Sequence, residues 1–146
     1  MKQIAELIED QTLTVIEPGF TVRIAAQTMA ERNIGAVAVV DSGKLAGIFS
    51  ERDLMSRVVA KGLDPDDTLV GLVMSKELVV ADPSEDVDQA LQKMHAIRAR
   101  HLPVVDDGKL VGMISIRDLL EVDDEQQRAK ATFLSELVTY SPDYES

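Results

Sequence analysis

Apolar and polar positions along the chain follow one pattern that occurs twice, 65 residues apart. Each copy opens with a short apolar stretch before a proline. Apolar residues then recur at i, i+3, i+4 and i+7, the spacing of one helix face. Two short apolar runs separated by Asp and Gly follow, which predicts a β-hairpin, and a second helix closes the copy. Each copy is therefore predicted to fold as β-α-β-β-α.

The same pattern sets the boundaries of the predicted elements. Thr21 and Asp86 stand one residue before the first apolar position of each first helix and are suitable N-caps. In the second helix of copy one, Leu54, Val58 and Val59 are expected on one apolar face. The predicted strands are residues 13–16, 36–40 and 45–49 in the first copy and 78–81, 102–105 and 110–114 in the second.

The two copies match without a gap, with 17 identities in the 40 positions that align residues 15–54 with 80–119. One copy alone cannot bury both faces of a three-stranded sheet, so we expect the copies to pack sheet to sheet about a pseudo-twofold axis. The predicted fold class is α+β, with α/β-like repeats. We place repeat 1 at residues 5–62, repeat 2 at 63–120, and a C-terminal helix and tail at 121–146.

Composition excludes several functions. The formal net charge is −11, with 15 basic residues against 26 acidic ones, which argues against a nucleic-acid-binding surface. The absence of cysteine excludes a disulfide, a thiolate nucleophile and a cysteine zinc site. The sequence shows neither an apolar leader nor a membrane-spanning run, so we expect no membrane partner and a cytoplasmic location.

The candidate chemistry lies where the second strand of each hairpin meets the last helix. Ser50 and Asp53 in the first copy, and Ser115 and Asp118 in the second, form a Ser-x-x-Asp motif. One interpretation is a capping box, in which the two side chains satisfy the free N–H groups of a helix start. The other is an anion site, in which those N–H groups and the serine hold a phosphate and the acid accepts ribose hydroxyls.

With its preceding glycine the motif reads Gly-x-x-Ser-x-x-Asp at residues 47–53 and 112–118. The sequence Leu-Pro-Val-Val-Asp, at 102–106, precedes the second of these motifs. In these motifs, over roughly residues 5–120, the chain resembles a tandem pair of cystathionine-β-synthase (CBS) domains, also called a Bateman module. Its size and its Phe-Ser-Glu-Arg-Asp string at 49–53 resemble small stand-alone bacterial members.

The resemblance implies an adenosine-nucleotide sensor with two binding clefts between the two repeats. AMP is the first expectation, with ATP, ADP, NAD(H) and S-adenosylmethionine as alternatives and no catalytic cofactor. In the family the motif aspartate binds ribose and the serine binds phosphate, while basic residues before the Leu-Pro-Val strand lie near the phosphate. The nucleotide-binding residues implied in this way are Ser115, Asp118, Arg100, His101, Thr12, Ser50 and Asp53.

The two clefts are not expected to be equivalent. At the offset of 65, Arg100 and His101 of the second copy correspond to Gly35 and Ala36 of the first, which carry no charge. A buried phosphate without a cation is costly, so the Asp118 site is predicted to be the tighter one.

The residues and the resemblance together favour an energy- or redox-sensing regulatory module over an enzyme. No nucleophile relay and no P-loop occurs in the sequence. We expect a homodimer, and signalling through a separate protein partner that the sequence does not identify. The alternative is a structural dimerisation unit without bound nucleotide, because a capping box alone also explains both serines.

Overall fold

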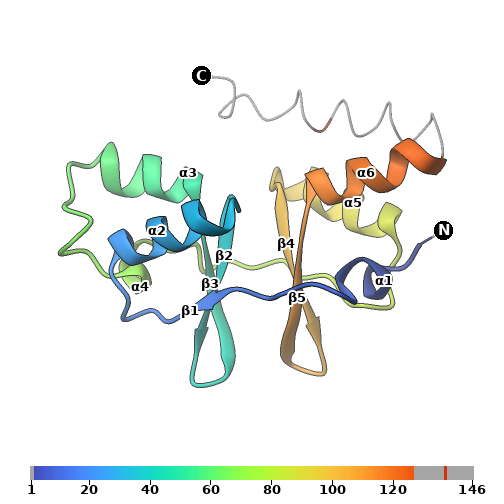
Figure 1. Cartoon of the computed structure of the whole chain (residues 1–146), viewed down its shortest axis with the longest axis horizontal. Coiled ribbons are helices and arrows are strands. Elements are labelled where there is room, and N and C mark those ends of the chain that lie inside the picture. Colours follow the sequence, from blue (N-terminus) through green and yellow to red (C-terminus); the bar gives the residue numbers. More distant parts are fainter. Residues whose placement is uncertain (1, 127–136, 138–146) are drawn as a thin grey trace. The chain divides into compact units, whose positions relative to one another are not determined.

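The computed structural model describes residues 2–126 and Leu137 (Figure 1). The chain divides into two compact units, which are described separately below. The first-repeat unit comprises residues 12–78 and 108–110, and the second-repeat unit comprises residues 1–11, 79–107 and 111 onward.

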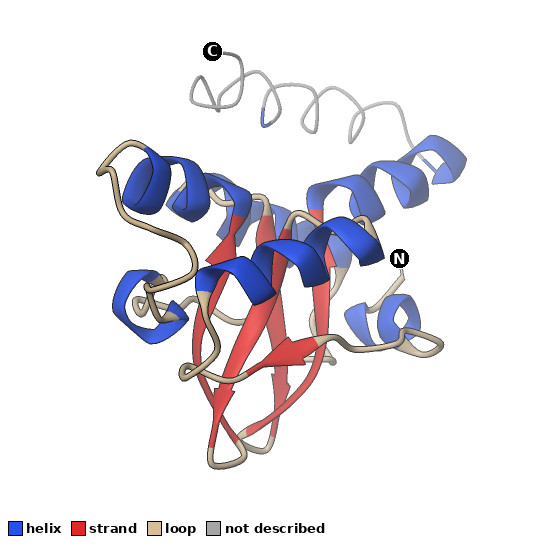
Figure 2. Cartoon of the chain, turned by 60° about the vertical axis from the view of Figure 1, so that its left-hand side comes forward, coloured by secondary structure: helices blue, strands red, loops and turns tan. Residues whose placement is uncertain are grey.

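Both repeats contain helices and strands, which confirms the mixed α+β class (Figure 2). In chain order the elements are α1 (Ile4–Ile8), β1 (Val15–Ile16), α2 (Val22–Arg32), β2 (Ala36–Asp41), β3 (Lys44–Ser50), α3 (Glu51–Asp53), the π-helix η1 (Leu54–Val59), α4 (Val70–Val73), α5 (Val87–Ile97), β4 (His101–Asp106), β5 (Lys109–Ser115) and α6 (Ile116–Gln126).

Each repeat builds its sheet around the predicted hairpin. In the first repeat the strand order is β1-β2-β3, with β1 parallel and β3 antiparallel to β2. In the second, β4 pairs with β5, and the stretch predicted as a strand at 78–81 contributes one parallel bridge, from Ala81 to Val104.

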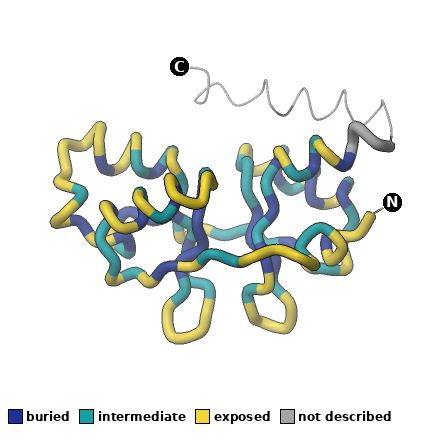
Figure 3. Tube along the Cα trace, viewed as in Figure 1, coloured by how far each residue is buried: buried dark blue, intermediate teal, exposed yellow. Residues whose placement is uncertain are grey.

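The hairpin turns explain why Asp and Gly stand between the strands. The two central residues have positive φ in both copies, 53° and 81° at Ser42 and Gly43 and 50° and 79° at Asp107 and Gly108. Positive φ at both positions is the requirement of a two-residue type I′ turn. The turns are exposed, whereas buried positions follow the strands and the inner helix faces (Figure 3).

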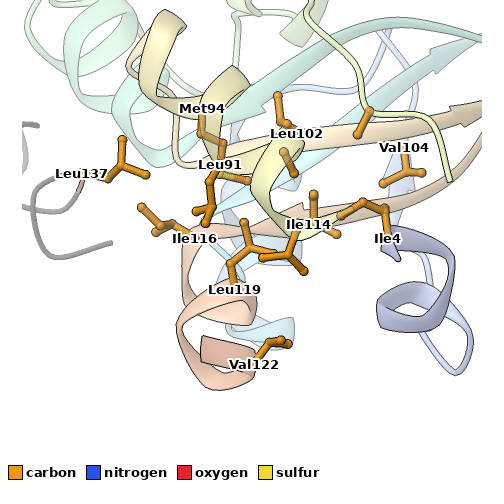
Figure 4. Packing of buried hydrophobic residues seen from close by; sticks show 13 residues of the cluster. Ile4, Leu91, Met94, Leu102, Val104, Ile114, Ile116, Leu119, Val122 and Leu137 are labelled. Atoms are coloured by element: carbon orange, nitrogen blue, oxygen red, sulfur yellow. The ribbon is translucent and has the colours of Figure 1, made fainter. Parts of the chain in front are cut away.

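Each unit has its own apolar core. In the first-repeat unit, the predicted apolar face of α2 packs with Val37 and Val39 of β2. The corresponding cluster of the second-repeat unit combines residues from five elements (Figure 4). Its labelled members are Ile4, Leu91, Met94, Leu102, Val104, Ile114, Ile116, Leu119, Val122 and Leu137. Thr21 and Asp86 cap their helices as predicted, accepting hydrogen bonds from the N–H groups of Ile24 and Gln89.

The compact units do not follow the repeat boundaries drawn on the sequence. Helix α1 joins the second-repeat unit, where Ile4 N–H donates to Glu85 O at 2.8 Å and Ala5 N–H to Pro83 O at 2.9 Å. Helix α4 makes the same contacts in the first-repeat unit, from Val70 to Phe20 and from Gly71 to Pro18. Helix α1, near the start of repeat 1, therefore packs in the second-repeat unit. Helix α4, near the start of repeat 2, packs in the first-repeat unit.

Two details differ from the sequence-based expectations. Val59 is 65% exposed, although it was expected on the apolar face with Leu54 and Val58. Val59 is the last residue of the π-helix η1 and is followed by an exposed turn. Residues 121–126 continue α6 and do not start a separate C-terminal helix; the rest of the predicted tail, except Leu137, lies outside the described residues.

Candidate functional site

Both Ser-x-x-Asp motifs form a capping box. Ser50 N–H donates to Asp53 Oδ2 at 3.0 Å and Asp53 N–H donates to Ser50 Oγ at 3.1 Å. In the second copy the corresponding distances, from Ser115 N to Asp118 Oδ2 and from Asp118 N to Ser115 Oγ, are 2.9 and 3.2 Å. The structural interpretation of the motif is therefore correct, and the remaining question is what else each carboxylate and hydroxyl can bind.

The side-chain oxygens of the first motif are already hydrogen-bonded within the first-repeat unit. Asp53 is 6% exposed, and its Oδ2 also accepts the Ser50 hydroxyl at 3.1 Å. Its Oδ1 accepts the Ser75 hydroxyl at 3.1 Å and lies 3.7 Å from Arg57 Nε. Both carboxylate oxygens and the Ser50 hydroxyl are thus committed to protein partners.

The second motif keeps two polar atoms available. Within residues 2–126 and Leu137, Asp118 Oδ1 accepts no hydrogen bond and the Ser115 hydroxyl donates none. Asp118 is also less buried than Asp53. An acceptor and a donor therefore remain at the start of α6, an 11-residue helix whose N-terminus favours an anion.

The difference between the motifs has two origins in the sequence. Position 57 holds Arg, whereas the position 65 residues on is Val122, an apolar side chain in the core of its unit. The second origin is the segment that lies against the strand before each motif. Ser75 pairs with Ile48 through both backbone groups, at 2.8 and 3.0 Å, and this pairing places its hydroxyl on Asp53.

In the second-repeat unit a side chain takes the place of that backbone pairing. Gln11 Nε2 donates to Met113 O at 2.6 Å, and Met113 N–H donates to Gln11 Oε1 at 2.8 Å. The amide of Gln11 thus satisfies the edge of β5 in the way that the Ser75 backbone satisfies β3. No hydroxyl from the described residues accompanies it, so Asp118 Oδ1 accepts no hydrogen bond from them.

The motif glycines serve this packing. In the structure a Cβ on Gly47 would lie 2.7 Å from Met74 Sδ, and one on Gly112 would lie 2.7 Å from Ile8 Cγ2. The space over each glycine is taken by the neighbouring chain segment.

Basic residues gather at the second motif as expected. Ile116 N–H donates to Arg100 O at 2.9 Å, which joins the start of β4 to the start of α6. Burial lowers the pKa of His101 to about 4; the Asp118 carboxylate acts in the opposite direction, and the charges of Arg100 and Arg117 lower the pKa further. At neutral pH the His101 imidazole is therefore uncharged, and the positive charge here comes from the two arginines.

The second-repeat unit thus brings four of the predicted site residues together, namely Ser115, Asp118, Arg100 and His101. Thr12 is exposed and belongs to the other unit, with Ser50 and Asp53. Sequence reasoning did not identify Ser75, Arg57 or Gln11. Their bonds connect positions up to 102 residues apart, and no local motif signals such a contact.

Two other features are absent from the described residues, a metal-binding cluster and a membrane-spanning helix. The described part of the chain contains no group of three or more His, Cys, Asp or Glu side chains arranged to hold a metal ion. No helix among those residues is both long and apolar enough to cross a membrane.

Comparison with protein families gives a match over most of the chain. The model of the CBS domain matches twice, at residues 4–60 and 70–125. The first match starts at α1 and the second at α4. Each copy of the family's domain therefore begins with a short helix that was not predicted from the sequence.

Relatives and solved structures agree with this match. The CBS domain-containing protein YhcV of Bacillus subtilis is 38% identical over 119 residues, covering 82% of this chain and 84% of that protein. Other curated relatives are longer; the CBS domain-containing protein CBSCBSPB2 of Arabidopsis thaliana is 36% identical, and the match covers 92% of this chain but 26% of that protein.

Among solved structures, a putative signal-transduction protein with CBS domains from Burkholderia ambifaria superposes with a TM-score of 0.80 at 36% identity, covering 86% of this chain and 97% of that one. The CBS domain pair of protein MJ0100, solved in complex with 5′-methylthioadenosine and S-adenosyl-L-methionine, has a TM-score of 0.77 at 22% identity, covering 87% and 99%. The latter likeness concerns the fold alone.

Proposed function

Because the chain belongs to the CBS domain family and carries two copies of the domain in tandem, we propose that it is a regulatory module that binds an adenine nucleotide at its second motif. The observation that carries this proposal is the difference between the two aspartates. Asp53 Oδ1 is occupied by Ser75, whereas Asp118 Oδ1 accepts no hydrogen bond from the described residues.

The atoms at the second motif suit a nucleoside phosphate. A carboxylate oxygen accepts hydroxyl donors, so Asp118 Oδ1 would bind a ribose hydroxyl. The Ser115 hydroxyl would donate to the phosphate at the N-terminus of α6, and Arg100 would supply the charge that a buried phosphate needs. His101 would contribute a neutral hydrogen-bonding group.

AMP is our first candidate ligand, with ATP, ADP, NAD(H) and S-adenosylmethionine as the alternatives. The MJ0100 domain pair shows that a protein of this fold can hold adenosine compounds. The first motif, with Ser50 and Asp53, would be empty or weaker, because its polar atoms are already bonded within the protein.

We further propose that the module acts by regulation and not by catalysis, as a homodimer that signals to a separate protein. The alternative function is a structural dimerisation unit. One observation favours it: both capping boxes are complete without any ligand, so the serines and aspartates already have a structural role.

Thermal unfolding with separate additions of AMP, ATP, NADH and S-adenosylmethionine distinguishes the two. A ligand at 100 times its dissociation constant adds about 2.7 kcal/mol to the free energy of unfolding. We expect a clear rise of Tm with an adenine nucleotide and none with GMP at the same concentration. No shift with any adenine compound, with co-purified nucleotide excluded by mass spectrometry, would support the structural dimer.

A further inference from the structure

The segment after α4 lies on the first motif and provides a hydroxyl to it. Ser75 is fixed by two backbone hydrogen bonds to Ile48, and Gly47 leaves room for it, since a Cβ at Gly47 would lie 2.8 Å from Ser75 O. Its side chain then donates to Asp53 Oδ1 at 3.1 Å. An O–H donor on that oxygen is the same chemical group that a ribose would offer.

Two groups share Asp53 Oδ1, and they do not hold it equally. Arg57 Nε is 3.7 Å away on a side chain that is 49% exposed, and such a pair contributes little. The Ser75 hydroxyl makes a direct, partly buried hydrogen bond to a charged group, which is the stronger interaction. Arg57 is also engaged elsewhere, donating to Val73 O and Met74 O at 3.2 and 3.0 Å.

The second-repeat unit shows the arrangement without this hydroxyl. There Gln11 pairs with the backbone of Met113 through its amide, and Asp118 Oδ1 accepts no hydrogen bond from the part of the chain that the structure describes. The two motifs are otherwise alike in their capping boxes. Of the two groups at Asp53 Oδ1, Ser75 makes the direct hydrogen bond, and Arg57 lies farther away.

We infer that Ser75 determines how many nucleotides the chain binds: its hydroxyl occupies Asp53 in the position of a ribose hydroxyl, which restricts adenine-nucleotide binding to the second motif. This inference rests on the proposed function. An adenine nucleotide binds at the first motif only when the Ser75 hydroxyl is removed, and Arg57 then provides a nearby cation.

The test is the binding stoichiometry of the purified full chain, measured by equilibrium dialysis with radiolabelled AMP. Wild type is expected to bind one equivalent per chain. Ser75→Ala keeps the backbone bonds to Ile48 and is expected to bind two. Adding Asp53→Asn to Ser75→Ala is expected to return the stoichiometry to one.

Two matched variants control for the loss of a serine hydroxyl as such. Ser56→Ala removes a hydroxyl that bonds to Arg52 O and not to the Asp53 carboxylate, and is expected to bind one equivalent. Ser75→Thr retains a hydroxyl and is also expected to bind one. Circular dichroism and Tm establish that each variant is folded before dialysis.

The outcomes separate this inference from the proposed function. Two equivalents on wild type, or one on Ser75→Ala, would overturn the role of Ser75 while leaving the nucleotide-binding module intact. No AMP, ATP, NADH or S-adenosylmethionine bound to any variant would overturn both.

Discussion

At the scale of single residues, the two Ser-x-x-Asp motifs have the same backbone geometry and different chemistry. Both serines and both aspartates close a capping box. Only the residues outside the motif, Ser75 and Arg57 in one copy and Val122 in the other, decide whether the remaining carboxylate oxygen is already bonded. A duplicated motif therefore does not by itself indicate a duplicated binding site.

His101 predicts a pH dependence of stability. Its pKa in the folded protein is about 4, below the ordinary value of 6.5, because burial disfavours the charged imidazole. Between pH 6.5 and 4 the unfolded chain binds a proton that the folded chain does not. The contribution of His101 to the free energy of unfolding is therefore complete above pH 6.5. It is lost as the pH falls from 6.5 to 4, with a slope of at most about 1.4 kcal/mol per pH unit.

Denaturant unfolding of wild type and His101→Gln at several pH values measures this contribution. We expect the variant to lose less stability than wild type between pH 6.5 and 4. Direct titration of the imidazole by NMR gives the pKa itself, with the resonance assigned from the variant. An imidazole that titrates near 6.5 in the folded protein would contradict the buried, neutral His101 described here.

At the scale of elements, the contact between each motif strand and the segment that crosses it depends on glycine. A Cβ at Gly47 would lie 2.7 Å from Met74 Sδ and 2.8 Å from Ser75 O, and the second contact is with backbone that cannot move aside easily. We expect Gly47→Ala to lower the free energy of unfolding by about 1–3 kcal/mol, the usual cost of overpacking.

The matched control for this prediction is Gly19→Ala. A Cβ at Gly19 meets nothing within 4 Å and the residue has no positive φ, so that change is expected to be nearly neutral. Chemical denaturation compares the two variants. Equal stability of Gly47→Ala and wild type would mean that the segment carrying Ser75 does not pack on β3 as described.

Most elements were predictable because their signals are local. The helix faces starting at Val22 and Val87, their N-caps and the hairpin turns follow from periodicity and from residues that tolerate positive φ. Helices α1 and α4 were missed because each is short, at five and four residues, and is held by the unit of the other repeat. Val59 was misplaced because it ends η1, and the sequence pattern does not fix where that helix stops.

The residues of the site also include some that the sequence could predict and some that it could not. The motif residues and the basic pair at 100 and 101 were identified from the sequence, and the structure places them together. The charge of His101 was not predictable, because it depends on how deeply the imidazole is buried. The hydrogen bond from the Ser75 hydroxyl to Asp53 was not predictable either, since it depends on which chain segment pairs with β3.

At the scale of the whole molecule, the family and the exposed surface together predict self-association. Several large apolar side chains of the first-repeat unit are exposed, among them Leu72 at 78%, Val59 at 65% and Met55 at 50%. These side chains are candidate contacts of the proposed homodimer.

Light scattering coupled to size exclusion at micromolar concentration measures the mass. The chain weighs 16.0 kDa, and we expect a species of twice that mass. A monomer across the accessible concentration range would contradict the homodimer, without bearing on nucleotide binding at Asp118.

The central claim is that the second motif, and not the first, binds an adenine nucleotide. Its most direct test is calorimetric titration of AMP into wild type, Asp118→Asn and Asp53→Asn, two matched changes in the two capping boxes. We predict that Asp118→Asn weakens binding by at least about tenfold, since a hydrogen bond to a charged group contributes about 1.5–3 kcal/mol. Asp53→Asn should bind AMP as wild type does. Equal weakening by both changes, or by Asp53→Asn alone, would contradict the account.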